Sequence, residues 1–205
     1  IAQSVYYFYC YFLAEDENQP INFSVPTGNF GDVYAGYLAK KLGLPINKLI
    51  VATNQNDILH RAISKGKYET EYVSETISPS MDIQIASNFE RLIYDLNNHD
   101  SSQTLDDMKN IKQNGKYTID VKKLKKINQD FLSARMSEQE TLDVIKNIYE
   151  TFNMVLDPHT AIGYGAFDKH DLKGNNIVLA TAHPCKFPDA ILKAINLKSD
   201  LPDEL

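Results

Sequence analysis

Two apolar segments, each followed by a helical pattern, dominate the first third of the sequence after residue 20. Residues 21–25 are β-prone, and from Asn29 the apolar residues recur at helical spacing until Gly43. Residues 49–53 form a continuous apolar run, as in a strand covered on both faces, and a helix is predicted over 56–65. This alternation of strand and helix with short connections predicts βαβ units around a parallel sheet.

The middle of the chain is more polar. Apolar residues share one face over 85–96 and form a second stripe over 121–134. Between them, 97–114 is polar, which predicts a loop with a short helix. We interpret 97–130 as a probable variable insertion.

The last part of the chain returns to regular alternation. Ser137 with Glu140 forms a capping box, which opens a helix that runs to about residue 152. The remaining predicted elements are a helix over 160–170, a strand over 176–181 and a helix over 187–195. The whole chain, 1–205, is therefore predicted to be one α/β unit. Its fold class is a three-layer, open, mostly parallel sheet with helices on both faces.

The first fourteen residues are apolar on nearly every side, which predicts a helix packed on several sides. An acidic loop over 15–20 follows. The apolar run is shorter than the ~20 residues that span a bilayer, and it lacks the basic start of a signal peptide, so no membrane partner is expected. Because the chain begins with Ile rather than Met, we expect it to be the inside of a longer protein.

Composition narrows the function classes. Apolar residues make up 43% and charged residues 23%, as in an ordinary globular protein. The formal net charge of −6 gives no general attraction for nucleic acid. Cys10 and Cys185 are too few for a disulfide framework and indicate thiols in a reducing cytoplasm. The five histidines lack paired metal-ligand spacing, so no metal site is predicted.

The strongest local signal is the segment Gly28, Asn29, Phe30, Gly31, Asp32, which follows a strand and opens a helix. Such a turn directs several backbone N–H groups at one point, where the helix dipole adds positive charge. A phosphate group suits that point. The segment matches neither GxGxxG nor a P-loop. A glycine-bearing turn without a ligand is an equally weighted alternative.

Two further clusters stand near predicted helix starts. Thr181 stands where the last apolar strand ends, at the edge where ligands of parallel sheets bind, and offers a neutral hydroxyl. His183 and Lys186 are nearby polar groups. For His183 taken by itself, hydrogen bonding to the backbone of the loop is the favoured interpretation. The third cluster, 157–160, is interpreted as a helix start with an acidic first turn.

Together these motifs resemble threonine synthase. The matching segments are VPTGNFGDVYAGYLAKKLGLPINKLIVATNQND (25–57), MDI (81–83), DPHTAIGY (157–164) and LATAHPCKF (179–187). The resemblance implies a pyridoxal 5'-phosphate enzyme of the tryptophan-synthase-β fold type, fold type II. It implies a carbon–oxygen lyase that converts O-phospho-L-homoserine and water to L-threonine and phosphate.

The resemblance also implies roles for matched positions. Gly28, Asn29, Phe30 and Gly31, with the N–H of Asp32, resemble the loop that binds the phosphate of the cofactor. Thr181 resembles the hydroxyl residue that faces the pyridine nitrogen. Cys185 stands where the family usually has Ala, a change between two small residues.

One family motif has no counterpart in these residues. The lysine that forms the Schiff base lies in a Phe-Lys-Asp-type motif of the amino-terminal half, and no such motif occurs here. No catalytic residue is therefore assigned, and the chain matches only the carboxy-terminal half. Its expected partner is the missing amino-terminal half. The alternatives are a non-catalytic remnant or phosphate-ligand-binding module, or an obligate partner of a separately encoded amino-terminal half.

Overall fold

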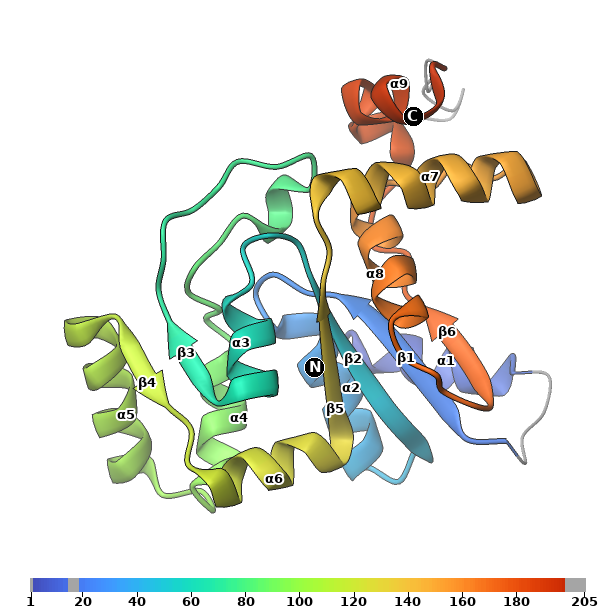
Figure 1. Ribbon diagram of the computed structural model, residues 1–205. Helices are drawn as coiled ribbons and strands as arrows, with labels where there is room; N and C mark the ends of the chain where they lie inside the picture. Colours follow the sequence, from blue (N-terminus) through green and yellow to red (C-terminus); the bar gives the residue numbers. More distant parts are fainter. Residues whose placement is uncertain (1, 15–18, 198–205) are drawn as a thin grey trace.

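The computed structural model describes residues 2–14 and 19–197, and a four-stranded sheet in the order β5-β2-β1-β6 forms its centre (Figure 1). The strands are β1 (Ile21–Pro26), β2 (Ile46–Thr53), β5 (Phe131–Arg135) and β6 (Asn175–Val178). Every neighbouring pair in this sheet is parallel. All six residues of β1 are buried, because β1 has a strand on each side and helices above and below.

Helices cover both faces of the sheet (Figure 1). One face packs against α2 (Gly31–Lys41) and α3 (Ile58–Lys65), with α1 (Ser4–Phe12) against α2. The other face packs against α8 (Pro158–Asp168), whose outer side carries α7 (Glu138–Phe152). The remaining helices are α4 (Phe89–Leu96), α5 (Ser101–Asn114), α6 (Val121–Asp130) and α9 (Pro188–Ile195), with 3-10 turns η1 (Pro79–Met81) and η2 (Pro184–Lys186).

Alternate strand residues face two separate cores, as the two-residue period of a strand requires. Phe23 and Leu49 pack into the core that includes α2 and α3. Ile50 and Ala52 pack into the core that includes Ile162 of α8. The predicted three-layer α/β architecture is confirmed by this arrangement.

Most predicted elements are present, with bounds moved by a few residues. The capping box is formed: Ser137 N donates to Glu140 Oε2 at 2.7 Å, and Glu140 N donates to Ser137 Oγ at 3.3 Å. The helix predicted from 160 begins earlier, at Pro158, because Asp157 accepts hydrogen bonds from its first turn. The strand predicted over 176–181 ends at Val178, so Thr181 lies beyond it.

The prediction of a loop with a short helix over 97–114 is wrong. Helix α5 occupies fourteen residues of this range, and Asp100 caps it by accepting hydrogen bonds from the N–H groups of Ser102 and Gln103. Only Thr104 and Ile111 of this helix are buried. Two buried positions give too sparse an apolar pattern to reveal a helix.

The apolar helical stripe predicted over 121–134 also extends too far along the chain. Helix α6 stops at Asp130, and the next residues form β5, which pairs with β2 through Phe131 opposite Leu49. The sequence also missed an antiparallel pair, β3 (Lys67–Glu69) and β4 (Lys116–Thr118). These short segments are strands because they pair with strands distant in the sequence, and local periodicity does not indicate such pairing. The variable insertion over 97–130 stays a prediction.

Helix α1 is covered on one side by the described residues. Tyr7 is fully buried, whereas Tyr6, Tyr9 and Phe12 are exposed, Phe12 by 72%. The expected packing on several sides is therefore not provided by the described part of the chain. The predictions for Ile1 and for 15–18 lie outside it. Within the described ranges, every helix is too short or too polar to cross a membrane.

Gly36 allows α1 to approach α2. A Cβ atom at Gly36 would lie 2.4 Å from Cε1 of Tyr7 and 2.9 Å from a methyl of Leu49. The Tyr7 hydroxyl then donates to the main-chain oxygen of Asp32 at 2.9 Å and to its Oδ1 at 3.2 Å. Burial, above all, and the nearby Asp32 raise the pKa of Tyr7, so its hydroxyl remains a donor.

We expect Gly36→Ala to lower the free energy of unfolding by about 1–3 kcal/mol, because the added methyl overlaps the Tyr7 ring. Urea denaturation measures the change. In a Tyr7→Leu background the overlapping ring atoms are gone and only the contact with the Leu49 methyl remains, so the same substitution should cost clearly less, since alanine also favours a helix over glycine. An equal loss in both backgrounds would contradict this account of the α1–α2 contact.

Candidate functional site

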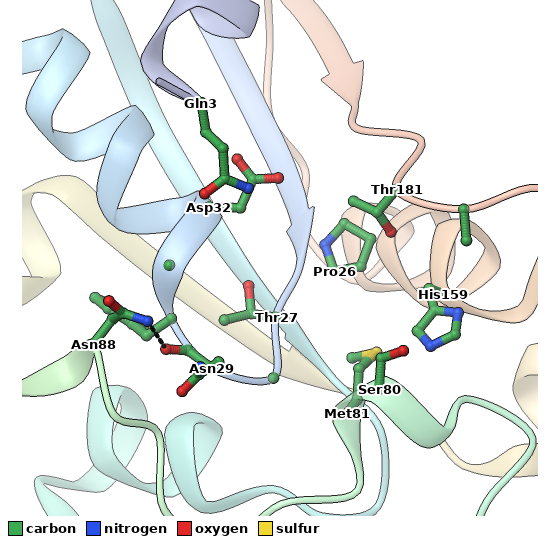
Figure 2. Close-up of a pocket in the computed structure, with 14 residues that line it drawn as sticks. Gln3, Pro26, Thr27, Asn29, Asp32, Ser80, Met81, Asn88, His159 and Thr181 are labelled. Carbon is green, nitrogen blue, oxygen red and sulfur yellow. Dashed lines mark hydrogen bonds between the residues drawn. The ribbon is translucent and has the colours of Figure 1, made fainter. Parts of the chain in front are cut away.

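A pocket lies at the carboxyl edge of the sheet, where the chain leaves β1 and β6 (Figure 2). From β1 the chain passes through α2 to β2 on one side, and β6 lies on the other side. In open parallel sheets, ligands bind where neighbouring connections diverge in this way. The pocket has a volume of about 380 Å³, and all six predicted site residues line it: Gly28, Asn29, Phe30, Gly31, Asp32 and Thr181.

The turn after β1 presents backbone donors to this pocket. Thr27 closes the strand: its N–H donates to Ala52 O at 2.8 Å and its hydroxyl to Val25 O at 2.6 Å. The first bond of α2 runs from Tyr34 N to Phe30 O at 3.2 Å. The N–H groups just before Tyr34 have no partner within the helix, and the positive end of the helix dipole lies there. An anion is the ligand that this geometry favours.

Phe30 holds this turn in an unusual conformation. Its φ of 63° is left-handed, which is costly for a residue with a side chain. The ring is fully buried and packs edge-on against Phe89 at 5.1 Å and tilted against Phe131 at 5.8 Å. The aromatic core thus fixes the backbone of the turn.

The two glycines of the turn differ in how strictly they are required. A Cβ at Gly28 would lie 2.7 Å from the main-chain oxygen of Ser80 and 3.1 Å from Cα of Met81. A Cβ at Gly31 would meet only side chains, the nearest being Asn88 Nδ2 at 3.3 Å. The close approach of η1 therefore explains Gly28, whereas backbone packing does not require glycine at position 31.

Asn29 ties the turn to the start of α4. Its Oδ1 accepts from the N–H and the hydroxyl of Ser87, both at 2.7 Å. Its main-chain oxygen accepts from Asn88 Nδ2 at 3.1 Å, the dashed line of Figure 2. These bonds hold the rim of the pocket opposite Thr181.

Asp82 anchors η1 to the loop after β2. Its Oδ1 accepts from Asn54 Nδ2 at 2.8 Å, from Asn56 Nδ2 at 2.9 Å and from the Thr76 hydroxyl at 2.6 Å. The sequence marked this region only through its MDI match. The network brings Ser80 and Met81 to the wall of the pocket.

Asp32 and Thr181 stand at two sides of the pocket. Burial raises the pKa of Asp32, opposed by the hydrogen bond from Tyr7. Thr181 is solvent-exposed and lies beside Pro26 in Figure 2. Among the described residues, the pocket wall includes neither His183 nor Lys186. His183 instead contacts Cys185, with Nδ1 2.8 Å from Sγ.

The start of α8 places His159 in the wall of the pocket. Asp157 Oδ1 accepts from His159 N at 2.8 Å and lies 3.0 Å from His159 Nδ1, and the Thr160 hydroxyl donates to Oδ2. Burial acts to raise the pKa of Asp157, but the hydrogen bonds from His159 and Thr160 outweigh it, and the pKa is lowered. The helix start predicted over 157–160 is present. The sequence missed that His159 reaches the pocket.

Comparison with known proteins gives a consistent result. A family model described as "Threonine synthase, C-terminal" matches residues 160–205. The chain is 42% identical to threonine synthase of Pseudomonas aeruginosa over 196 residues, which are 95% of this chain and 42% of that protein. It is 43% identical to threonine synthase of Saccharomyces cerevisiae over 233 residues, with 100% of this chain and 45% of that protein covered.

The structural match is closer still. PLP-bound threonine synthase from Brucella melitensis superposes with a TM-score of 0.95 at 44% identity, over 98% of this chain and 44% of that one. The fold is that of pyridoxal-phosphate enzymes of fold type II, as the resemblance implied. The chain spans less than half the length of each of these relatives.

We expect Asp157→Asn to lower the free energy of unfolding by about 1–3 kcal/mol at neutral pH, because buried donors lose a charged acceptor. Because the pKa of Asp157 is lower in the folded chain than in the unfolded chain, its carboxylate stabilises the fold fully above the unfolded pKa, near 4. This stability is lost as the pH falls through the folded pKa. The variant should therefore show a flatter loss of stability below about pH 4. Urea denaturation across pH 2–7 measures both effects.

Asp100→Asn is the matched control, since Asp100 caps the exposed start of α5 in the same way. It should cost less, about 1 kcal/mol or under. An acid dependence of Asp157→Asn identical to that of the unmodified chain would contradict the role given to Asp157.

Proposed function

Since the chain is a homologue of threonine synthase and covers about 45% of the length of such proteins, we propose that it is the carboxy-terminal part of one. In this proposal the whole polypeptide converts O-phospho-L-homoserine and water to L-threonine and phosphate in the cytoplasm, with pyridoxal 5'-phosphate as cofactor. The observation that carries it is the turn 28–32, whose backbone donors line the same pocket as Thr181.

The residues present fit that cofactor. The free N–H groups at the start of α2 suit a phosphate monoester, and Gly28 keeps η1 close without blocking the turn. A pocket of about 380 Å³ lies within the range of ordinary small-molecule sites. When bound, pyridoxal phosphate stabilises negative charge that develops on substrate carbon.

Each part of the pocket has a separate task in the proposal. The turn 28–32 binds the phosphate and orients the ring. Thr181 offers its neutral hydroxyl to the pyridine nitrogen, which leaves that nitrogen unprotonated. Phe30 and Asn29 keep the turn rigid, so that little ordering is required when the ligand binds.

The Schiff-base lysine is proposed to come from an amino-terminal part that packs beside α1 and β6. A second cavity, of about 480 Å³, lies between Tyr6 and Tyr9 of α1 and the segment 177–181. In the described part of the chain, β6 pairs with β1 only. An exposed aromatic face beside an open sheet edge is typical of an interface.

We expect the 205-residue chain to bind pyridoxine 5'-phosphate more tightly than pyridoxine or inorganic phosphate, because the first ligand uses both the turn and Thr181. Calorimetric titration measures the three affinities. Gly31→Val should weaken the two phosphate-bearing ligands by about tenfold, since it places a branched side chain at the anion site. Thr181→Val should weaken the two ring-bearing ligands, pyridoxine 5'-phosphate and pyridoxine, and leave inorganic phosphate unchanged.

Thr118→Val, at an exposed position of β4, is the matched control and should change nothing. Equal affinity for pyridoxine 5'-phosphate and inorganic phosphate would favour the phosphate-ligand-binding module instead. Unchanged binding by Gly31→Val would remove the turn from the proposal.

We expect the chain to form a complex with the amino-terminal part of the Pseudomonas aeruginosa enzyme, and the mixture to release threonine from O-phosphohomoserine. Sedimentation and amino-acid analysis provide the measurements. Tyr9→Asp on α1 should abolish the complex, whereas Leu105→Asp, at an exposed leucine of α5, should not. A monodisperse chain that ignores the added part would favour the non-catalytic remnant.

A further inference from the structure

A thiol and an imidazole lie in contact on the segment between β6 and α9. Nδ1 of His183 is 2.8 Å from Sγ of Cys185, which belongs to the 3-10 turn η2. In the described part of the chain, neither residue lines the pocket at the turn 28–32. Cys185 is half-buried and His183 is exposed, so the pair lies at the surface. A cysteine bonded to an imidazole combines a nucleophile with a base.

A second hydrogen bond decides which nitrogen of His183 carries the proton. The main-chain N–H of Cys185 donates to the same Nδ1 atom at 3.3 Å and so caps η2. An amide N–H is always a donor, so Nδ1 is an acceptor and the proton of the neutral imidazole is on Nε2. The thiol therefore donates to Nδ1 as well. The imidazole is held where it takes the proton of the thiol.

The other cysteine of the chain has different surroundings. Cys10 is also half-buried, but it lies on α1 and packs against the main hydrophobic core. Burial raises the pKa of its thiol. Among the residues that the structure describes, no imidazole is hydrogen-bonded to its sulfur. Because the thiolate is the reactive form of cysteine, Cys10 is the slower nucleophile of the two.

We propose that Cys185 is a site of reversible oxidation by hydroperoxides, with His183 as the base. The site goes beyond the proposed function and does not depend on it. The resemblance to threonine synthase does not imply it either, since the family usually has Ala at the position of Cys185.

The proposed step is balanced with hydrogen peroxide as the oxidant. Nδ1 of His183 takes the thiol proton, and the sulfur of Cys185 attacks one oxygen of the peroxide. An S–O bond forms, the O–O bond breaks, and the departing hydroxide takes the proton back from the imidazolium. The products are a sulfenic acid and water, so sulfur loses two electrons and the peroxide gains them. An added thiol then reduces the sulfenic acid through a mixed disulfide.

The test compares the two cysteines within one molecule, the 205-residue chain treated with hydrogen peroxide at neutral pH. Dimedone traps sulfenic acids, and peptide mass spectrometry gives the rate at each cysteine. We expect Cys185 to react at least about tenfold faster than Cys10, as for assistance by a positioned base. Dithiothreitol added in place of dimedone should restore the thiol. In urea, where the pair is no longer held together, the two rates should become similar.

Two variants separate the base from the cap of η2. His183→Asn keeps a side-chain oxygen that accepts from Cys185 N but does not take the thiol proton. His183→Ala removes both functions. Each should slow oxidation of Cys185 by about tenfold and leave Cys10 unchanged. Free imidazole should restore part of the rate in His183→Ala. His99→Asn, at an exposed histidine after α4, is the matched control and should change neither rate.

The outcomes are distinct. Selective oxidation of Cys185 that both His183 variants slow, with recovery by imidazole, supports the proposal. Equal rates at Cys185 and Cys10, or fast oxidation that neither variant slows, overturns it. Slowing by His183→Ala alone also overturns it, because the cap and not the base then sets the rate. Slowing by both variants with no recovery by imidazole removes His183 as the base. None of these results bears on the proposed function, since the step does not involve the turn 28–32.

Discussion

The burial of β1 on both faces is the constraint on which the rest of the structure depends. A strand with a neighbour on each side and helices on both faces must satisfy any polar side chain internally. Ser24 does so by donating to the main-chain oxygen of Gly163 in α8 at 2.6 Å. Asn22 donates to Lys173 O at 3.0 Å, before β6, and accepts from Asn47 at 2.8 Å, in β2. These bonds set β1 against both neighbouring strands and α8.

The position of α8 follows from the same contacts and explains the pocket. A Cβ at Gly163 would lie 2.9 Å from Val178 and 3.1 Å from Pro26, so the absence of a side chain lets the helix lie directly on β1 and β6. The start of α8, with His159, then reaches the carboxyl edge of the sheet beside the turn after β1. Two helix N-termini thus border one pocket, and their positive ends favour an anionic ligand. The Asp157 carboxylate accepts hydrogen bonds from the first turn of α8 and so compensates its positive end. The turn at the start of α2 is therefore the stronger anion site.

How far the sequence predicted the site depends on whether each residue is placed locally or by distant packing. The turn 28–32 was found because glycine placement between a strand and a helix is a local pattern. Thr181 was found because it follows an apolar strand. The position of His159 is set by α8 docking on the sheet, which no spacing reveals. Its sequence signal, Asp157 followed by Pro and His, equally fits an ordinary helix start.

The same distinction holds for the fold. Strands buried on both faces and the capped helix α7 follow from local apolarity and capping chemistry, and both were predicted. The segment after Asp130 reads as the end of a helix, yet Phe131 must cover the ring of Phe30 and pair with β2. Pairing over eighty residues of sequence overrides the local pattern there. The left-handed conformation of Phe30 depends on that packing. The contact with Phe131, which the sequence does not reveal, therefore supports the turn 28–32, which is the clearest signal in the sequence.

Helix α1 links the exposed surface to the site. Tyr7 enters the space that Gly36 leaves open, and its hydroxyl bonds Asp32 in the first turn of α2. Phe23 receives the other edge of the ring at 4.9 Å, so Tyr7 is locked between β1 and α2. The opposite side of α1 is exposed and aromatic. A partner that covers this side of α1 also contacts the helix that carries Tyr7. Because Tyr7 is bonded to the first turn of α2, which forms the anion site, binding of the partner and binding of the ligand are expected to be coupled.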